Sequence, residues 1–71
     1  MRARKRKHNR YFAIPAYQVL KKLTDKDVAN HLGVSTRTYK DKIEGWSEFS
    51  LSEGRALSEL LTVTQEELFI T

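Results

Sequence analysis

The side chains best suited to recognition chemistry lie in the stretch TRTYKDKIE, residues 36–44. If this stretch is a helix with Tyr39 and Ile43 on its buried side, the step of about 100° per residue places Arg37 and Asp41 on the opposite side. A guanidinium can donate two parallel hydrogen bonds to guanine O6 and N7, and a carboxylate can accept one from cytosine N4. These residue types therefore favour recognition of polar groups by an exposed helix face.

Two short helices joined by a tight turn are predicted to position this face. Thr24 is a good N-cap for the first helix, and Asp27 can return a bond to the N–H of the cap in a weaker form of the capping box. Gly33 accepts the left-handed backbone that ends a helix. Ser35 then caps the second helix, which ends at Gly45. This is a helix-turn-helix pattern, in which the second helix enters a DNA major groove.

Three further helices are predicted around this pair. Pro15 favours the first turn of a helix over residues 15–23. A capping box at residues 50–53 opens a helix over residues 51–61, and a second one at residues 64–67 opens a last helix over residues 65–69. The predicted fold is all-α, with five short helices and a single domain over residues 11–71. The residues expected to face inward in the first and fourth helices are Ala16, Val19, Leu20, Leu23, Leu51, Ala56, Leu57, Leu60 and Leu61.

The composition excludes several classes of protein. The 71 residues contain no cysteine, and no apolar run approaches the ~20 residues needed to cross a bilayer. The basic N-terminus has no apolar stretch behind it, so we expect no secretory signal and a cytoplasmic location. His8 and His31 are too isolated for a metal site, which needs three or four ligands. No catalytic set can be assembled, so we expect no enzyme, no cofactor, no metal, no membrane and no small-molecule substrate.

The charge of the chain is unevenly distributed. Residues 1–43 hold twelve Lys and Arg against three Asp, a balance of +9, whereas residues 44–71 hold one Arg against six Glu, a balance of −5. The basic half contains the candidate recognition helix, which favours a polyanionic partner. The alternative is a soluble domain whose charge is uneven for no functional reason.

Residues 1–10, MRARKRKHNR, form a basic N-terminal arm that has too few apolar residues to pack and is expected to be disordered when free. The arm could follow DNA phosphates or enter a minor groove, or it could be a solubilising tail. Tyr11 and Phe12, which follow it, are expected to pack on the core; stacking on a base is the alternative.

The order of the helices and three motifs resemble the lambda-repressor/Cro-type (XRE) helix-turn-helix family. The motifs are Thr24…Ala29…Gly33-Val34-Ser35, F-S-L-S-E at residues 49–53 and V-T-Q-E-E-L-F at residues 63–69. The resemblance covers residues 15–69 and is closest to short phage-type regulators with Tyr or Phe in the middle of the recognition helix. It implies a small phage or prophage transcription regulator that binds operator DNA in the host cytoplasm, associated with the nucleoid, usually as a dimer.

The resemblance also implies a set of contact residues, with the recognition helix at about residues 36–44. Base edges or neighbouring phosphates would be contacted by Thr36, Arg37, Lys40 and Asp41. The DNA backbone would be contacted by basic and hydroxyl residues of the arm, the helices and the following loop: Arg2, Arg4, Lys5, Arg6, Lys7, Arg10, Lys22, Lys26, Thr38, Lys42 and Ser47. The alternative for Arg37 and Lys40 is an ordinary solvated face.

Two positions depart from the family pattern. Gln is common after the first cap of the motif, where it braces a phosphate and the recognition helix, but this chain has Asp25, which only accepts hydrogen bonds. Glu44 also stands where a donor would be more favourable. These carboxylates, with Asp41, favour a second hypothesis, a protein-interaction module such as a phage modulator or antirepressor that binds a repressor through the same fold.

The apolar residues near the C-terminus have two possible roles. They could pair two copies or could simply close the core; they are Leu68, Phe69 and Ile70.

Overall fold

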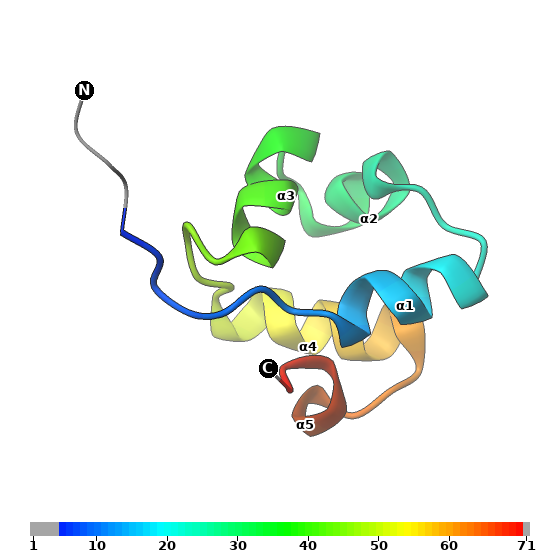
Figure 1. Ribbon diagram of the computed structural model, residues 1–71. Coiled ribbons are helices and arrows are strands. Elements are labelled where there is room, and N and C mark those ends of the chain that lie inside the picture. Colours follow the sequence, from blue (N-terminus) through cyan, green and yellow to red (C-terminus); the bar gives the residue numbers. More distant parts are fainter. Residues whose placement is uncertain (1–4, 71) are drawn as a thin grey trace.

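The computed structural model describes residues 5–70, which form five helices and no strand (Figure 1). In chain order the helices are α1 (Ala13–Leu20), α2 (Asp25–Leu32), α3 (Thr36–Glu44), α4 (Leu51–Leu61) and α5 (Gln65–Leu68). The expected all-α fold of five short helices is confirmed. In Figure 1, α2 and α3 lie together above α4, α5 lies below it, and α1 lies between α2 and α5 in this view.

The predicted caps fix the start of most of these helices. Thr24 accepts the Asp27 N–H at 3.1 Å while the Asp27 carboxylate accepts the Thr24 N–H at 2.9 Å, so this capping box is complete. Ser50 and Glu53 form an equally complete box at α4. Ser35 accepts from the Thr38 N–H at the start of α3. Each bond satisfies an N–H group that has no partner within its own helix.

The core lies where the five helices meet. Tyr39 and Ile43 of α3 are 1% and 5% exposed, so both point inward as expected. Leu68 of the four-residue α5 is fully buried, so it closes the core and is unavailable for pairing with a second copy. The buried residues that form the core cluster are Ile14, Val28, Ala29, Tyr39, Ile43, Leu57, Leu61 and Leu68.

The first helix differs from its prediction. It begins at Ala13, two residues before Pro15, and ends at Leu20. Pro15 is tolerated in the first turn because the N–H groups there need no helical partner. The buried face of α1 also differs from the predicted one, because it is formed by Ala13, Ile14 and Gln18. The prediction that Ala16, Val19 and Leu20 face inward is wrong: all three are exposed, and Leu23 is only half-buried.

Three smaller predictions also need correction. Leu51 is 81% exposed, because Gly54, Leu57 and Leu61 form the buried face of α4 and Leu51 stands in the first turn at its edge. Phe12 is 55% exposed because it directly precedes α1, although Tyr11 does pack on the core. The last helix ends one residue early, at Leu68.

Candidate nucleic-acid interface

The outer face of α3 carries the predicted base-contacting residues. Arg37 and Lys40 are exposed, and Thr36 and Asp41 are half-buried. This arrangement follows from the burial of Tyr39 and Ile43, which fixes the rotation of α3 about its axis. The side chains proposed for base edges therefore come together along one face.

A buried polar network holds α3 against α1 and α2. The Tyr39 hydroxyl donates to Gln18 Oε1 at 2.5 Å, and Gln18 Nε2 donates to Asp25 Oδ1 at 2.8 Å. Gln18 is 6% exposed, so both ends of its amide are satisfied inside the protein. Burial and then the charge of Asp25 raise the pKa of Tyr39, so its hydroxyl stays a donor.

The sequence reasoning missed Gln18 and misjudged the role of Asp25. Asp25 accepts from α1 at the position where the family pattern has Gln. A usable signal was present, because Gln18 lies four residues after Ile14 and a polar residue on the inner face of a short helix needs a partner. Asp25, which can only accept, is thus paired with a donor, the side-chain amide of Gln18 on α1.

Two ion pairs lie beside this network. The Arg10 Nε lies 3.0 Å from Glu44 Oε1, and the Lys40 Nζ lies 3.8 Å from the second oxygen of Asp25. The four side chains are 39–63% exposed, so both pairs face solvent. They line a depression of about 250 Å³ whose floor includes Tyr39. Arg10 and Lys40, at the outer face of α3, are therefore already paired with carboxylates.

Lys42 is held away from this surface. Its ammonium lies 2.7 Å from Glu53 Oε1 and donates to the Glu48 carbonyl at 3.1 Å. It also lies 5.7 Å from the centre of the Phe49 ring. Only 13% of the Lys42 side chain is exposed, so this lysine fixes the end of α3 to the start of α4.

The N-terminal arm is seated on the C-terminal end of α3. The Lys7 N–H donates to the Gly45 carbonyl at 2.7 Å, and the Tyr11 N–H donates to the Ile43 carbonyl at 2.9 Å. The His8 imidazole stacks on Tyr11, with ring centres 4.2 Å apart, and its Nε2 lies 3.0 Å from the carbonyl oxygen of Ser47. Carbonyls at the end of a helix have no helical donor, so the arm supplies it.

These contacts differ from the expectation of an unattached arm over residues 1–10. Residues 5–10 follow a defined path, and the Arg6 guanidinium lies 5.0 Å from the centre of the Trp46 ring. The prediction gave no weight to the partial negative charge at the end of α3, which attracts a basic segment. The expected contacts of Arg2 and Arg4 fall outside the described residues.

The passage of the arm leaves no room for a side chain at position 45. Gly45 has φ of +100°, and a Cβ built there would overlap the carbonyl oxygen of His8. Gly33 also has positive φ, +76°, but has open space around it. Gly45 therefore serves both the helix end and the arm.

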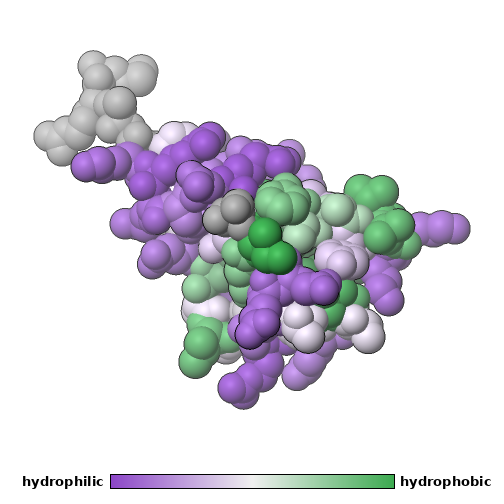
Figure 2. All heavy atoms as spheres, turned by 60° about the horizontal axis from the view of Figure 1, so that its bottom comes forward, coloured by the Kyte–Doolittle hydropathy of each residue, from purple (hydrophilic) through white to green (hydrophobic). Residues whose placement is uncertain are grey.

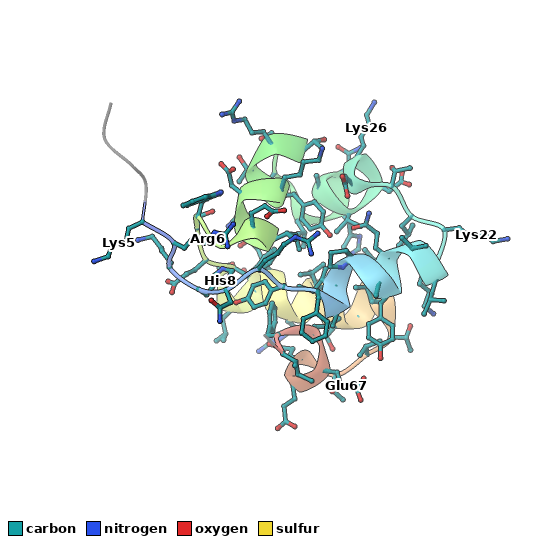
Figure 3. All side chains as sticks on the ribbon, in the orientation of Figure 1. Lys5, Arg6, His8, Lys22, Lys26 and Glu67 are labelled. Carbon is teal, nitrogen blue, oxygen red and sulfur yellow. The ribbon has the colours of Figure 1, made fainter. Side chains whose placement is uncertain are left out.

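The other expected backbone contacts are spread around α3. Figure 3 shows Lys5 and Arg6 on one side of α3 and Lys26 near α2 on the other, while Lys22 lies on the distant link between α1 and α2. Thr38 is exposed and its hydroxyl accepts from Ser35, whereas the carbonyl of Ser47 is occupied by His8. Glu67 lies at the opposite end of the molecule, where it accepts from Tyr17.

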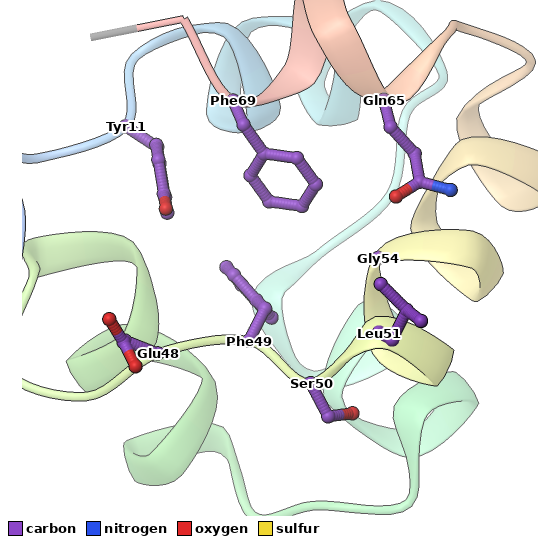
Figure 4. Close-up of a pocket in the computed structure, with 8 residues that line it drawn as sticks. All are labelled: Tyr11, Glu48, Phe49, Ser50, Leu51, Gly54, Gln65 and Phe69. Carbon is purple, nitrogen blue, oxygen red and sulfur yellow. The ribbon is translucent and has the colours of Figure 1, made fainter.

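A second depression, of about 380 Å³, lies near α4 and α5. Figure 4 shows three aromatic rings and the Glu48 carboxylate around it. Figure 2 brings this side forward and shows hydrophobic patches separated by hydrophilic side chains. The residues that line the depression are Tyr11, Glu48, Phe49, Ser50, Leu51, Gly54, Gln65 and Phe69.

Residues 5–70 contain neither a metal-binding cluster nor a membrane-spanning helix. No group of three or more His, Cys, Asp or Glu side chains there is placed to hold a metal ion. No helix in the same range is long and apolar enough to cross a membrane.

Comparison with known proteins identifies the fold. The chain is similar to the restriction-modification controller protein C.AhdI from Aeromonas hydrophila, with a TM-score of 0.68 and 21% sequence identity over 80% of this chain and 83% of that one. No protein-family model matches the sequence, and no curated protein does. The likeness confirms the predicted helix-turn-helix fold.

Proposed function

We propose that this protein is a sequence-specific DNA-binding transcription regulator that places α3 in the major groove. The observation that carries the proposal is the outer face of α3, where Arg37 and Lys40 are exposed because Tyr39 and Ile43 are buried. The similar fold of a restriction-modification controller protein supports the same class of function. Within that class, the resemblance to phage-type regulators with Tyr or Phe in the recognition helix favours a phage or prophage regulator acting in the bacterial cytoplasm.

Direct recognition of bases is assigned to Thr36, Arg37, Lys40 and Asp41. Arg37 is placed to donate to guanine O6 and N7, a contact worth about 1–3 kcal/mol of discrimination against other bases. Thr36, at the first position of α3, can pack on a thymine methyl group. Asp41 would be repelled by phosphates, so its proposed role is to accept from cytosine N4 or to orient Arg37.

Contacts with the DNA backbone are assigned to the arm and to α2. The arm residues Lys5, Arg6 and Lys7 lie beside the C-terminal end of α3, so they would follow phosphates next to this helix. Lys26, in the first turn of α2, lies where helix N–H groups also favour an anion. Lys42 is left out of the proposed contacts because its ammonium is paired with Glu53.

A homodimer on DNA remains part of the proposal. Leu51 and Ile70 are 81% and 49% exposed on apolar surface that a second copy could cover. Sedimentation at micromolar concentration, with and without duplex DNA, would detect the dimer. A monomer under both conditions would contradict it.

The decisive experiment is selection from a pool of random duplexes, followed by fluorescence anisotropy of the enriched sequence. We expect an enriched sequence that binds at least about 10³-fold more tightly than a scrambled duplex. Log affinity should fall with log salt by about 0.9 for each phosphate contacted. If no sequence is enriched and no duplex binds below about 10 μM, a module that binds another protein becomes the better account. The carboxylates Asp25, Asp41 and Glu44 near α3 are the features that favour that second function.

A matched pair of variants tests the role of Arg37. Arg37→Ala should abolish the preference at one base pair of the enriched sequence, whereas Arg55→Ala, the same change on an exposed position of α4, should not. Equal weakening across all sequences would instead assign Arg37 to a phosphate.

A further inference from the structure

Lys40 on the outer face of α3 and Arg10 beside it are each paired with a carboxylate. Arg10 pairs with Glu44 at 3.0 Å, and Lys40 pairs with Asp25 at 3.8 Å. Isolated pairs this exposed add little to stability. Their position beside the recognition helix, around one depression, is therefore more informative than their energy.

The two carboxylates differ in how firmly they are held. Asp25 uses its other oxygen to accept from Gln18, whose amide is fixed in turn by the Tyr39 hydroxyl. This chain of bonds starts in the core and ends at Lys40, so Asp25 is a rigid partner that gives the lysine a preferred direction. Glu44 stands in the last turn of α3 and holds Arg10, which belongs to the arm.

We propose that Asp25 and Glu44 are specificity-determining residues that keep Lys40 and Arg10 from binding phosphates indiscriminately. This inference rests on the proposed DNA-binding function. Non-specific affinity comes almost entirely from cations on phosphates, and a paired cation must first leave its carboxylate. The exposed carboxylate then repels the same phosphate, so binding to the wrong sequence is penalised.

The same carboxylates lower the affinity for the operator less than the affinity for non-specific DNA. There Lys40 faces base edges, and a lysine held by Asp25 is already oriented for them, so less side-chain freedom is lost on binding. Removing the carboxylate releases Lys40 toward phosphates and removes that orientation. The ratio of operator affinity to non-specific affinity should therefore fall, even where overall affinity rises.

The test uses the full chain with Asp25→Asn and Glu44→Gln. Each change removes a charge but keeps an oxygen that can accept from Gln18 or from Arg10. Glu59→Gln, on an exposed position of α4, is the control for the change in net charge alone. Affinities are measured by anisotropy at about 0.1 M salt for the selected operator and for a scrambled duplex. Thermal melts verify that all variants are folded.

We expect each carboxylate variant to bind the scrambled duplex about two- to fivefold more tightly than Glu59→Gln does, with less than a twofold gain on the operator. In an Arg10→Gln background, the effect of Glu44→Gln should shrink, because no cation is released and only the direct repulsion between the carboxylate and phosphates is removed. The inference fails if the variants match Glu59→Gln, or if both duplexes gain equally. If the wild-type chain selects no sequence, the proposed function fails first and this inference with it.

Discussion

Substitution of Gly45 by alanine tests whether the arm is seated on α3. An alanine at φ of +100° costs about 1–2 kcal/mol in any surroundings. Here the new Cβ would also overlap the His8 carbonyl, so the arm must move. That movement breaks the Lys7–Gly45 hydrogen bond and the His8–Ser47 contact, each worth about 0.5–1.5 kcal/mol. The chain freedom that the released arm regains offsets part of this loss, so we expect a total of about 2–4 kcal/mol.

Gly33→Ala is the matched control. Gly33 also ends a helix with positive φ, but a Cβ there meets nothing within 4 Å. Its cost should be the backbone cost alone, about 1–2 kcal/mol. Both values are obtained from urea unfolding followed by the fluorescence of the single tryptophan, Trp46.

A third chain, lacking residues 1–8, separates the arm from the backbone effect. Without His8 there is nothing to overlap the new Cβ, so Gly45→Ala and Gly33→Ala should cost the same to within about 0.5 kcal/mol. Equal costs in the full-length chain would refute the seating of the arm. An excess cost at Gly45 that persists after the deletion would show that the excess has another cause.

Three further predictions follow from the same contacts. Tyr39→Phe should destabilise the fold by about 1–3 kcal/mol in urea unfolding, because the buried Gln18 oxygen loses its donor; a neutral result would mean that the bond contributes nothing. Burial, the largest single influence, raises the pKa of Glu53, but the hydrogen bonds from Lys42 and Ser50 together with the charge of Lys42 outweigh it, and the pKa lies below its ordinary value of 4.5. The stability lost in Glu53→Gln should therefore be visible at neutral pH and should vanish as pH falls below about 4.5, whereas a pH-independent loss would exclude the ion pair. Deletion of residues 1–7 should reduce the salt dependence of DNA binding while the far-UV circular dichroism stays helical, and an unchanged dependence would make the arm a solubilising tail.

The parts of the fold that could be predicted are those set by neighbours in the sequence. Thr24 and Ser50 lie three residues before a carboxylate that can complete a capping box, so α2 and α4 were located from the chain alone. The inward side of α3 followed from the spacing of Tyr39 and Ile43. Local chemistry determines each of these features.

The parts that could not be predicted depend on distant partners. The arm gains its position from carbonyls at the end of α3, more than thirty residues later in the chain, and no pattern among neighbouring residues predicts that contact. The face of α1 was misassigned because the apolar Val19 and Leu20 suggested burial, whereas packing selected Ile14 and the polar Gln18. Lys42 could not be distinguished from its exposed neighbours until Glu53 was placed beside it.

The burial of Leu68 has a consequence for synthesis on the ribosome. Leu68 is fully buried in the core, yet α5 has only four residues and cannot be stable by itself. In a nascent chain whose Leu68 has not yet left the ribosome, the core beneath α3 is incomplete. Loss of such a side chain typically costs about 2–5 kcal/mol of folding free energy. We therefore expect α3 to gain a fixed orientation only once residue 68 can reach the core. Partly made chains should remain incompletely packed and should be degraded readily.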